Sequence, residues 1–306
     1  MFFTRRAFLS GLLSLSLTSC LGTFEVVYLN NAPSRRYEEI NSRKEIQKIN
    51  FVHLNAAGLR GNTPFLFESI SEREARYHAQ WLATYLINQK ADIISLNEVD
   101  YFGTIKTGGL DQPRIIAEYM GAPFDYVLFD QYMESPIWTT GNAVISQFPM
   151  QAVHRHLYGG NNLLDSRLEH LYKDFIHTEI EVGNKKLNLI TTHLDHEDDK
   201  HVSKREEEAK EVAEYIAAIK EKNPNSYIVA AGDYNDSHDR EAIKIILSSG
   251  LLPSEKFGLK TYQNGDPTKD LDHILASSNI RINNYRTFVF PWSDHLGLIC
   301  ELEFSE

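Results

Sequence analysis

Short apolar runs that end at turn-type residues recur along the chain, and they constrain its fold more than any other feature. Most of these runs are rich in β-branched or aromatic residues, which favour strands in a half-buried sheet. We predict strands at Ile49–Leu54, Asp92–Leu96, Tyr126–Phe129, Ala143–Ser146, Phe175–Val182, Leu187–Thr192, Tyr227–Ala231, His273–Ala276, Thr287–Phe290 and Leu298–Phe304.

Two longer stretches carry helix signals instead. The stretch Ser71–Gln89 opens with a serine whose capping box is completed by Glu74, and Ser203–Lys222 opens in the same way with Glu206. Apolar residues at helical spacing give each stretch an inward stripe, made of Trp81, Tyr85, Val212, Tyr215 and Ile216. Many strands with few helices between them predict sheets packed together, with helices outside.

The first twenty residues, MFFTRRAFLSGLLSLSLTSC, have the layout of a secretory signal: a basic pair, an apolar run and then small residues. Leu17–Cys20 resembles a bacterial lipobox, in which the cysteine is lipidated, and Thr4–Leu9 resembles a twin-arginine export signal. An uncleaved signal anchor is the alternative, although the run is short for a membrane span. We therefore predict a signal peptide over residues 1–20 and a membrane-anchored lipoprotein, periplasmic or on the cell surface.

The rest of the chain reads as a tether followed by one domain. Residues 21–47 are polar and without a clear period, whereas residues 48–306 contain no linker or low-complexity tract. With 42% hydrophobic residues, this length can bury a sizeable core. Of the two cysteines, Cys20 is assigned to the anchor, so we predict that Cys300 is a buried thiol. The net charge of −11 disfavours a general nucleic-acid binder but does not exclude a nuclease, since bound cations can invert the local field.

Polar residues follow or open several of the predicted strands, where sites are commonly built on a rigid sheet. They are Asn55, Glu98, His193, Asp233, Asn235, Asp272, Ser293, Asp294 and His295. Each one alone reads as a turn or surface residue. Together they supply hard oxygen ligands for a magnesium-like ion, two histidines and further carboxylates.

The segments that carry these residues resemble the endonuclease/exonuclease/phosphatase family of phosphoesterases. In family order they are HLNAAGLRG, SLNEVD, GNAVISQFP, TTHLDH, AAGDYND, LDHILAS and SDHLGL, and they lie within residues 51–298. The resemblance implies an α+β fold, a four-layer αββα sandwich of two mainly antiparallel sheets flanked by helices.

The resemblance also implies roles for individual residues. Glu98 would be the main ligand of Mg²⁺ or Mn²⁺, with Asn55 beside it and Asp294 near the metal. Asp233, held by Asn235, would orient or deprotonate the attacking water. His295, paired with Asp272, would contact the scissile phosphate, and His193 would be a second phosphate-facing group. These roles suit water attack on an anionic ester, which needs its charge spread and a nearby base.

Two positions depart from the family pattern. Asn97 precedes Glu98 where the family usually has glutamine. An arginine that many members carry after the GNAVIS segment is matched only by Lys173 or by Arg167, and lysine lacks the bidentate fork of arginine. The residue that clamps the phosphate therefore stays open between these two.

The predicted activity is metal-dependent hydrolysis of phosphoesters, without a choice between diesters and monoesters. Lipid head groups, nucleic acid and small soluble phosphates are the competing substrates, and the membrane anchor weakly favours lipid-related or scavenged ones. A secreted-type nuclease and a non-catalytic binding protein on a dead phosphatase scaffold are the alternatives. Nothing in the sequence indicates a protein partner, and we expect a monomer.

Overall fold

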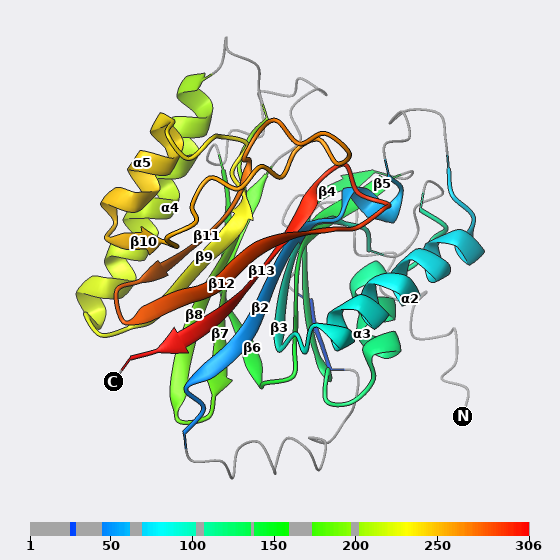
Figure 1. Ribbon diagram of the computed structural model, residues 1–306, viewed down its shortest axis with the longest axis horizontal. Coiled ribbons are helices and arrows are strands. Elements are labelled where there is room, and N and C mark those ends of the chain that lie inside the picture. The colour runs from blue at the N-terminus through cyan, green and yellow to red at the C-terminus, as the bar shows by residue number, and fades with distance from the viewer. Residues whose placement is uncertain are drawn as a thin grey trace, which may run out of the picture.

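The computed structural model describes residues 25–28, 45–61, 69–101, 107–135, 138–158, 173–196 and 202–305, which form two packed sheets with helices outside (Figure 1). The strands of the first sheet are β1 (Glu25–Tyr28), β2 (Lys48–Asn55), β3 (Ile93–Val99), β4 (Tyr126–Ser135), β5 (Trp138–Ser146), β12 (Ile280–Val289) and β13 (Leu296–Phe304). They lie in the order β1-β4-β5-β3-β2-β13-β12.

The second sheet has six strands in the described part of the chain. They are β6 (Met150–Leu157), β7 (Asp174–Val182), β8 (Lys185–His193), β9 (Tyr227–Asp233), β10 (Leu251–Pro253) and β11 (Asp272–Ser277). Their order is β10-β11-β9-β8-β7-β6. Each sheet has one parallel pair among the described strands, β2 with β3 and β8 with β9, and the other pairs are antiparallel.

The helices lie on the two outer faces, and two of them connect the strands of the parallel pairs. In chain order they are the 3-10 turn η1 (Ala57–Leu59), α2 (Glu72–Asn88), α3 (Gln112–Met120), α4 (Val202–Lys222) and α5 (Glu241–Ser248). Figure 1 shows α2 and α3 against the first sheet and α4 and α5 against the second. This is the predicted four-layer αββα sandwich.

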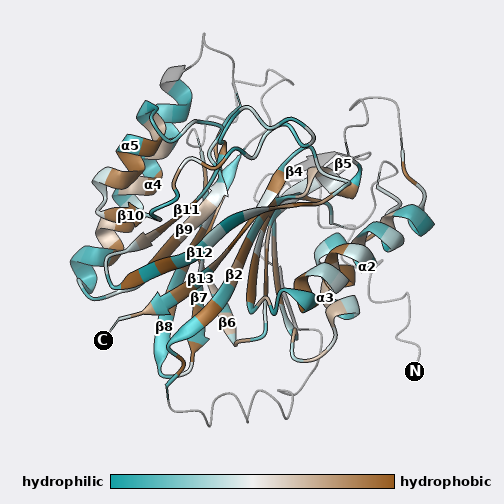
Figure 2. Ribbon diagram, viewed as in Figure 1, coloured by the Kyte–Doolittle hydropathy of each residue, from teal (hydrophilic) through white to brown (hydrophobic). Residues whose placement is uncertain are grey.

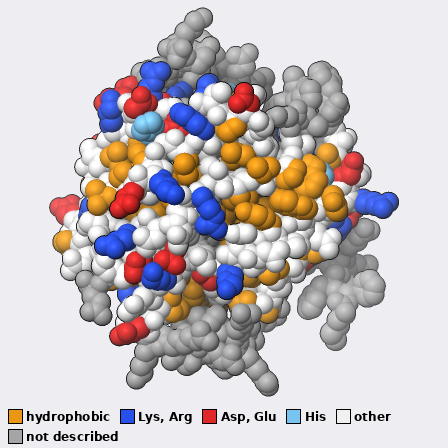
Figure 3. Space-filling model, viewed as in Figure 1, with side chains coloured by type: hydrophobic (Ala, Val, Ile, Leu, Met, Phe, Trp, Pro, Cys, Tyr) orange, Lys and Arg blue, Asp and Glu red, His pale blue; other side chains and the backbone are white. Residues whose placement is uncertain are grey.

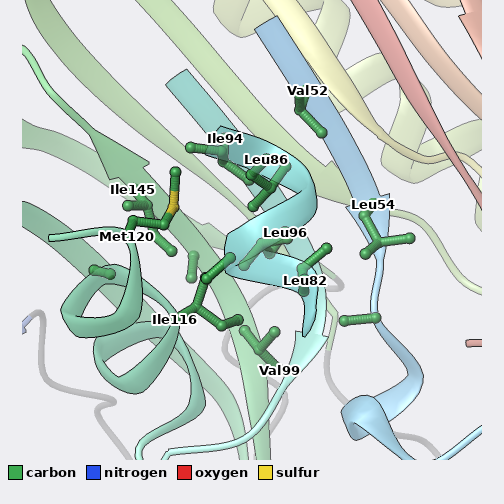
Figure 4. Packing of buried hydrophobic residues seen from close by; sticks show 14 of the residues in the cluster. Val52, Leu54, Leu82, Leu86, Ile94, Leu96, Val99, Ile116, Met120 and Ile145 are labelled. Atoms are coloured by element: carbon green, nitrogen blue, oxygen red, sulfur yellow. The ribbon is translucent and has the colours of Figure 1, made fainter. Parts of the chain in front are cut away.

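Three buried clusters hold the layers together. The first packs α2 and α3 against the first sheet through side chains such as Leu82, Leu86 and Ile116 (Figure 4), and the third packs α4 and α5 against the second sheet. The remaining cluster fills the space between the two sheets with residues such as Phe51 and Leu187. Figure 2 shows the corresponding apolar faces of the helices turned toward the sheets. Burial of this apolar surface is the main favourable term in folding.

All the predicted strands are present, most of them longer than predicted. The capping box of Ser71 and Glu74 at the start of α2 is confirmed, because each residue bonds to the backbone N–H of the other. The prediction that Ser203 begins the second long helix is wrong by a small margin, since α4 begins at Val202. Cys300 is confirmed as a buried free thiol on β13.

The sequence prediction missed three strands and two α-helices. These are β1, β6, β10, α3 and α5. Strand β1 lies inside the segment predicted as a tether and pairs with β4 at the sheet edge. The lipobox-like Cys20 and Arg167 lie outside the described residues. Among the residues that are described, no helix is both long and apolar enough to cross a bilayer.

Candidate active site

The inward face of the central strands changes character along their length. On β2, Phe51 belongs to the apolar cluster between the sheets, whereas His53 and Asn55 further along the same face are buried polar residues. The same order recurs in Ile93, Ser95 and Asn97 of β3 and in Leu189, Thr191 and His193 of β8. On β9 the apolar Val229 and Ala231 are followed by Asp233. Because these strands end at one rim, their polar ends meet there.

Asp233, at the end of β9, is the centre of this polar cluster. Its Oδ2 accepts a hydrogen bond from Asn55 Nδ2 at 2.9 Å, and its Oδ1 accepts one from the backbone N–H of Asn235 at 2.9 Å. The same Oδ2 lies 3.5 Å from His193 Nε2 and 3.7 Å from His295 Nε2. Burial raises the pKa of Asp233, which makes this carboxylate a stronger base than an exposed one.

The glycine before Asp233 is required by the close approach of β8. A Cβ on Gly232 would lie 2.0 Å from the carbonyl oxygen of Thr192, a distance that no side chain can adopt. Gly232 therefore lets β8 and β9 pair right up to the rim, where His193 lies opposite Asp233 in the parallel register.

His295 is held by a fully buried carboxylate. Asp272 Oδ2 lies 2.7 Å from His295 Nδ1, and the other oxygen, Oδ1, lies 3.3 Å from His53 Nε2. Although burial alone would lower it, the carboxylates of Asp272 and Asp233 raise the pKa of His295 to about 10. Asp272 shows the reciprocal effect: its histidine partners hold its pKa well below the usual range, against the effect of burial. His295 is therefore an imidazolium at neutral pH.

His193 is held in the opposite protonation state. Its Nε2 contacts Lys173 Nζ and lies 3.3 Å from Asn235 Nδ2. Burial, together with the positive charges of Lys173 and His295, lowers the pKa of His193 well below its usual value. Lys173 is itself buried, and burial lowers its pKa. Of the two predicted phosphate clamps, Lys173 therefore lies in the site.

Glu98 reaches the cluster through an irregular backbone. The register between β3 and β5 shifts between Leu96 and Val99, and Glu98 has φ +51°, a left-handed conformation that is uncommon outside glycine. The Glu98 side chain stays about one-third exposed, and its Oε1 accepts from Asn55 Nδ2 at 3.2 Å. Strained backbone of this kind concentrates at functional sites.

The donor set suits a hard divalent cation. Ligand atoms of Glu98, His193 and Asp233 all lie within 4.8 Å of one another, and so do those of Asp233, Asp272 and His295. Carboxylate oxygens are the donors that Mg²⁺ and Mn²⁺ prefer. Asn55 turns its amide nitrogen toward the carboxylates and its oxygen toward the N–H of Ala57, so its role as a metal ligand stays a prediction.

Asp294 is not a member of either convergent group of ligand atoms among the described residues. It lies close enough to Glu98 to feel its charge, because burial and Glu98 raise the pKa of Asp294 while His295 opposes them. The predicted place near the metal is compatible with this position. Asp294 therefore stays a predicted ligand.

A second layer of buried polar residues was not predicted from the sequence. Asn97 accepts the backbone N–H of Asp233 at 2.8 Å and donates to Asn142, whose amide in turn donates to Asp174. His53 holds the second oxygen of Asp272. The alternation of side chains along a strand could have revealed them. His53 and Asn97 are polar residues on the same strand faces as Phe51 and Ile93, which pack between the sheets. Asn142 has a similar place on β5, two residues before Val144 and on the same face.

Fold and site together define a four-layer αββα sandwich whose rim gathers buried carboxylates and histidines of opposite charge state. The model of the Endonuclease/Exonuclease/phosphatase family matches residues 53–295, and the chain belongs to this family. Members of the family hydrolyse phosphoesters, and their activity depends on divalent metal.

Individual relatives are more distant. The chain is 28% identical over 171 residues to a sphingomyelinase C of Bacillus cereus, and this match spans about half of each protein. Among solved structures, the endonuclease/exonuclease/phosphatase protein of Beutenbergia cavernae has a TM-score of 0.66 at 17% identity, covering 85% of this chain and 72% of that one. A mannosyl-6-phosphatase of Bacteroides thetaiotaomicron has a TM-score of 0.57 at 16% identity, covering 84% and 100%. These structural likenesses establish the fold.

Proposed function

We propose that this protein is a divalent-metal-dependent phosphoesterase that directs water onto a phosphate ester. The observation that carries the proposal is the position of Asp233, whose Oδ2 lies 3.5 Å from one histidine of the site and 3.7 Å from the other. A base with a raised pKa next to an imidazolium is an arrangement suited to hydrolysing an anionic ester.

In the proposed reaction, Asp233 accepts the proton of the attacking water, and the backbone N–H of Asn235 and the amide of Asn55 hold its carboxylate in place. His295, protonated and fixed by Asp272 through Nδ1, donates a hydrogen bond to a phosphoryl oxygen from its other ring nitrogen, Nε2. Lys173, beside His193, supplies a second positive group to the same rim. As the water oxygen bonds to phosphorus, the P–O bond to the alcohol breaks, and the departing oxygen takes up a proton from solvent. Because the nucleophile is water, no covalent enzyme intermediate forms.

Glu98 would hold the cation, with Asn55 beside it and Asp294 near it. A bound Mg²⁺ or Mn²⁺ would polarise the phosphoryl oxygens and offset their negative charge as attack proceeds. Because about one-third of the Glu98 side chain is exposed, substrate can reach the part of the site where the cation would bind. Without a cation, Glu98 and Asp233 repel the phosphate, so we expect activity to disappear with chelators.

We further propose that the substrate is a phosphodiester of a lipid head group, met on the outer side of the cytoplasmic membrane. Two observations support this: the lipobox-like Leu17–Cys20, and the similarity to sphingomyelinase C over half the chain. If Cys20 is the anchor, Cys20→Ala should release the protein from membranes or block its maturation. Unchanged membrane fractionation, with no lipid mass on the N-terminal peptide, would contradict the anchor.

The deciding experiment is a substrate panel assayed with magnesium, manganese and calcium. It contains sphingomyelin, phosphatidylinositol, plasmid DNA, inositol phosphates and a bis-aryl phosphate, with Asp233→Asn as the matched inactive control. We expect metal-dependent turnover of a choline or inositol lipid. Cleavage of DNA alone would establish the nuclease alternative, and a folded protein that turns over nothing would favour the dead scaffold.

A further inference from the structure

A strip of aromatic side chains lies on the surface of α2. Tyr77, Trp81 and Tyr85 follow one another at intervals of four residues, and so share one face of the helix. Trp292, just after β12, joins them: its ring centroid lies 5.5 Å from that of Tyr77 and 5.8 Å from that of Trp81. We call these four residues the aromatic strip. In Figure 3, hydrophobic side chains gather over this part of the molecule.

The sequence predicted that Trp81 and Tyr85 point inward, and this is only partly so. Both rings pack against the first core cluster but stay partly exposed, and Tyr77 is 58% exposed. A groove of about 440 Å³ runs along the strip, lined by Tyr77, Gln80, Trp81, Thr84, Tyr85 and Asn88. None of these six side chains is charged. The lining of the groove is therefore uncharged, with three aromatic and three polar side chains, in a chain whose net charge is −11.

The aromatic strip is continuous with the candidate active site. Trp292 stacks on His78 with ring centroids 4.1 Å apart, and the next residue, Ser293, donates from Oγ to the carbonyl of Asn55 at 2.6 Å. Asp294 and His295 follow directly. The loop Trp292–His295 thus contributes its first residue to the aromatic strip and its next three residues to the candidate active site.

We propose that the aromatic strip is the surface by which this enzyme sits on a zwitterionic phospholipid bilayer. Tryptophan and tyrosine combine an apolar body with a polar tip, and this is why they gather at membrane interfaces. The neutral groove avoids the cost of burying charge, and the acidic protein is repelled by anionic lipid. Seated in this way, the loop Trp292–His295 would bring the site to the head-group layer.

The position of the predicted anchor agrees with this orientation. Cys20 lies five residues before β1. Five residues of fully extended chain span at most about 18 Å. Strand β1 belongs to the sheet that α2 covers. The anchor would therefore leave from the half of the sandwich that carries the aromatic strip. That the bilayer also carries the substrate rests on the proposed function.

Contact can be measured without catalysis, because two of the three tryptophans of the chain lie in the aromatic strip. The full-length protein, reconstituted through its own N-terminus, is mixed into phosphatidylcholine vesicles with brominated acyl chains. We expect quenching of tryptophan fluorescence that Trp81→Phe and Trp292→Phe each reduce, and that the double variant loses. Quenching carried only by Trp138, or absent altogether, would overturn the proposal.

A second pair of variants tests the effect on activity. Gln80→Glu with Thr84→Glu places two charges in the groove, and Ala217→Glu with Ala218→Glu adds the same charge to exposed positions of α4 on the opposite face. We expect the first pair to lower the rate on vesicle substrate, relative to a soluble bis-aryl phosphate, by at least about tenfold. The α4 pair should leave this ratio unchanged, and equal ratios for the two pairs would count against the proposal.

Other outcomes separate this inference from the proposed function. If no phosphoester is cleaved, the proposed function fails, while quenching still reports whether the strip touches lipid. If quenching is absent and Gln80→Glu with Thr84→Glu converts a dimer to a monomer in sedimentation, the strip is an interface between copies, and the proposal is wrong. Tighter binding to anionic than to zwitterionic vesicles would also overturn it.

Discussion

Strand β8 contributes Leu187 and Leu189 to one end of the layer between the sheets, and Thr191 and His193 to the other, all on a single face. The first end is an apolar core, and the second is a network of buried polar groups. Buried polar groups are tolerated only when they are hydrogen-bonded. At the polar end Asp233 meets this condition with Asn55 and Asn235, and Asp272 meets it with His53 and His295.

The contrast shows how one fold separates stability from chemistry. At the apolar end, side chains contribute by removing surface from water. At the polar end, the same strand geometry gathers several groups whose pKa values are shifted, and such clusters are common where a protein acts on a substrate. The two ends should therefore respond differently to substitution.

The largest effect is expected at the polar end, on rate. Asp233→Asn removes the proposed base and should lower turnover by about 10²–10⁴. Stability should change little, because burial raises the pKa of Asp233 and the neutral amide no longer bears the cost of burying a charge. Steady-state kinetics and a thermal melt, measured on the same preparation, check both parts.

His295→Ala serves as the partner test, with a rate loss of similar size expected because it removes the imidazolium. A rate within about threefold of wild type for Asp233→Asn would show that another group is the base. Capture of a phosphorylated residue during turnover would contradict direct attack by water.

The next largest effect is expected at the apolar end, on stability. Leu187 is fully buried, and Leu187→Ala should lower the free energy of unfolding by about 2–5 kcal/mol through lost burial and a cavity. The turnover number of the folded enzyme should stay close to that of wild type. Denaturant unfolding with kinetics at low temperature tests this, and a fall in turnover without a fall in stability would break the comparison.

A smaller effect is expected for metal affinity. Glu98→Gln keeps the shape of the side chain but removes its charge, and should weaken binding of magnesium or manganese by about 10–10² together with activity. Stability should be kept, because the side chain is about one-third exposed. Titration calorimetry that finds wild-type affinity in the variant would show that Glu98 is not a ligand.

Much of this contrast could be predicted from the sequence. The apolar runs predicted the strands, and their polar ends supplied most of the site, because alternation and strand ends are local properties of a chain. The strands β6 and β10 were missed since β6 has no continuous apolar run and β10 has only three residues, one of them Pro253.

What could not be predicted depends on contacts between distant segments. The link from Asn97 to Asp233 joins residues 136 positions apart, and that from His53 to Asp272 joins residues 219 apart. The opposite charge states of His193 and His295 follow from their neighbours in space, Lys173 and Asp272, and not from neighbours in the sequence. The left-handed backbone of Glu98 likewise arises from a register shift between paired strands.

The smallest effect concerns the pH dependence of stability, and it compares a carboxylate at the apolar end with one at the polar end. Asp92 lies just before β3 at the apolar end and is partly buried. It accepts hydrogen bonds from the backbone N–H of Asn50 and from the side-chain amide of Gln147, but it has no cationic partner among the described residues. Burial raises the pKa of Asp92 to about 6, whereas histidine partners hold the pKa of Asp272 below its usual range. A raised carboxylate pKa means that the folded state favours the protonated form. The stabilising contribution of Asp92 is therefore fully present below about pH 4 and is lost as pH rises through 6.

Comparison with Asp92→Asn isolates this contribution, since asparagine does not titrate. The stability of wild type minus that of the variant should fall by on the order of 1–3 kcal/mol between pH 4 and pH 8. Glu255→Gln, at an exposed position, controls for the change in net charge and should show no such trend. Denaturant midpoints at several pH values measure the difference. A difference that rises with pH would mean that Asp92 behaves like the paired carboxylate Asp272. The charged form of Asp92 would then be stabilised in the folded protein, which would contradict this prediction.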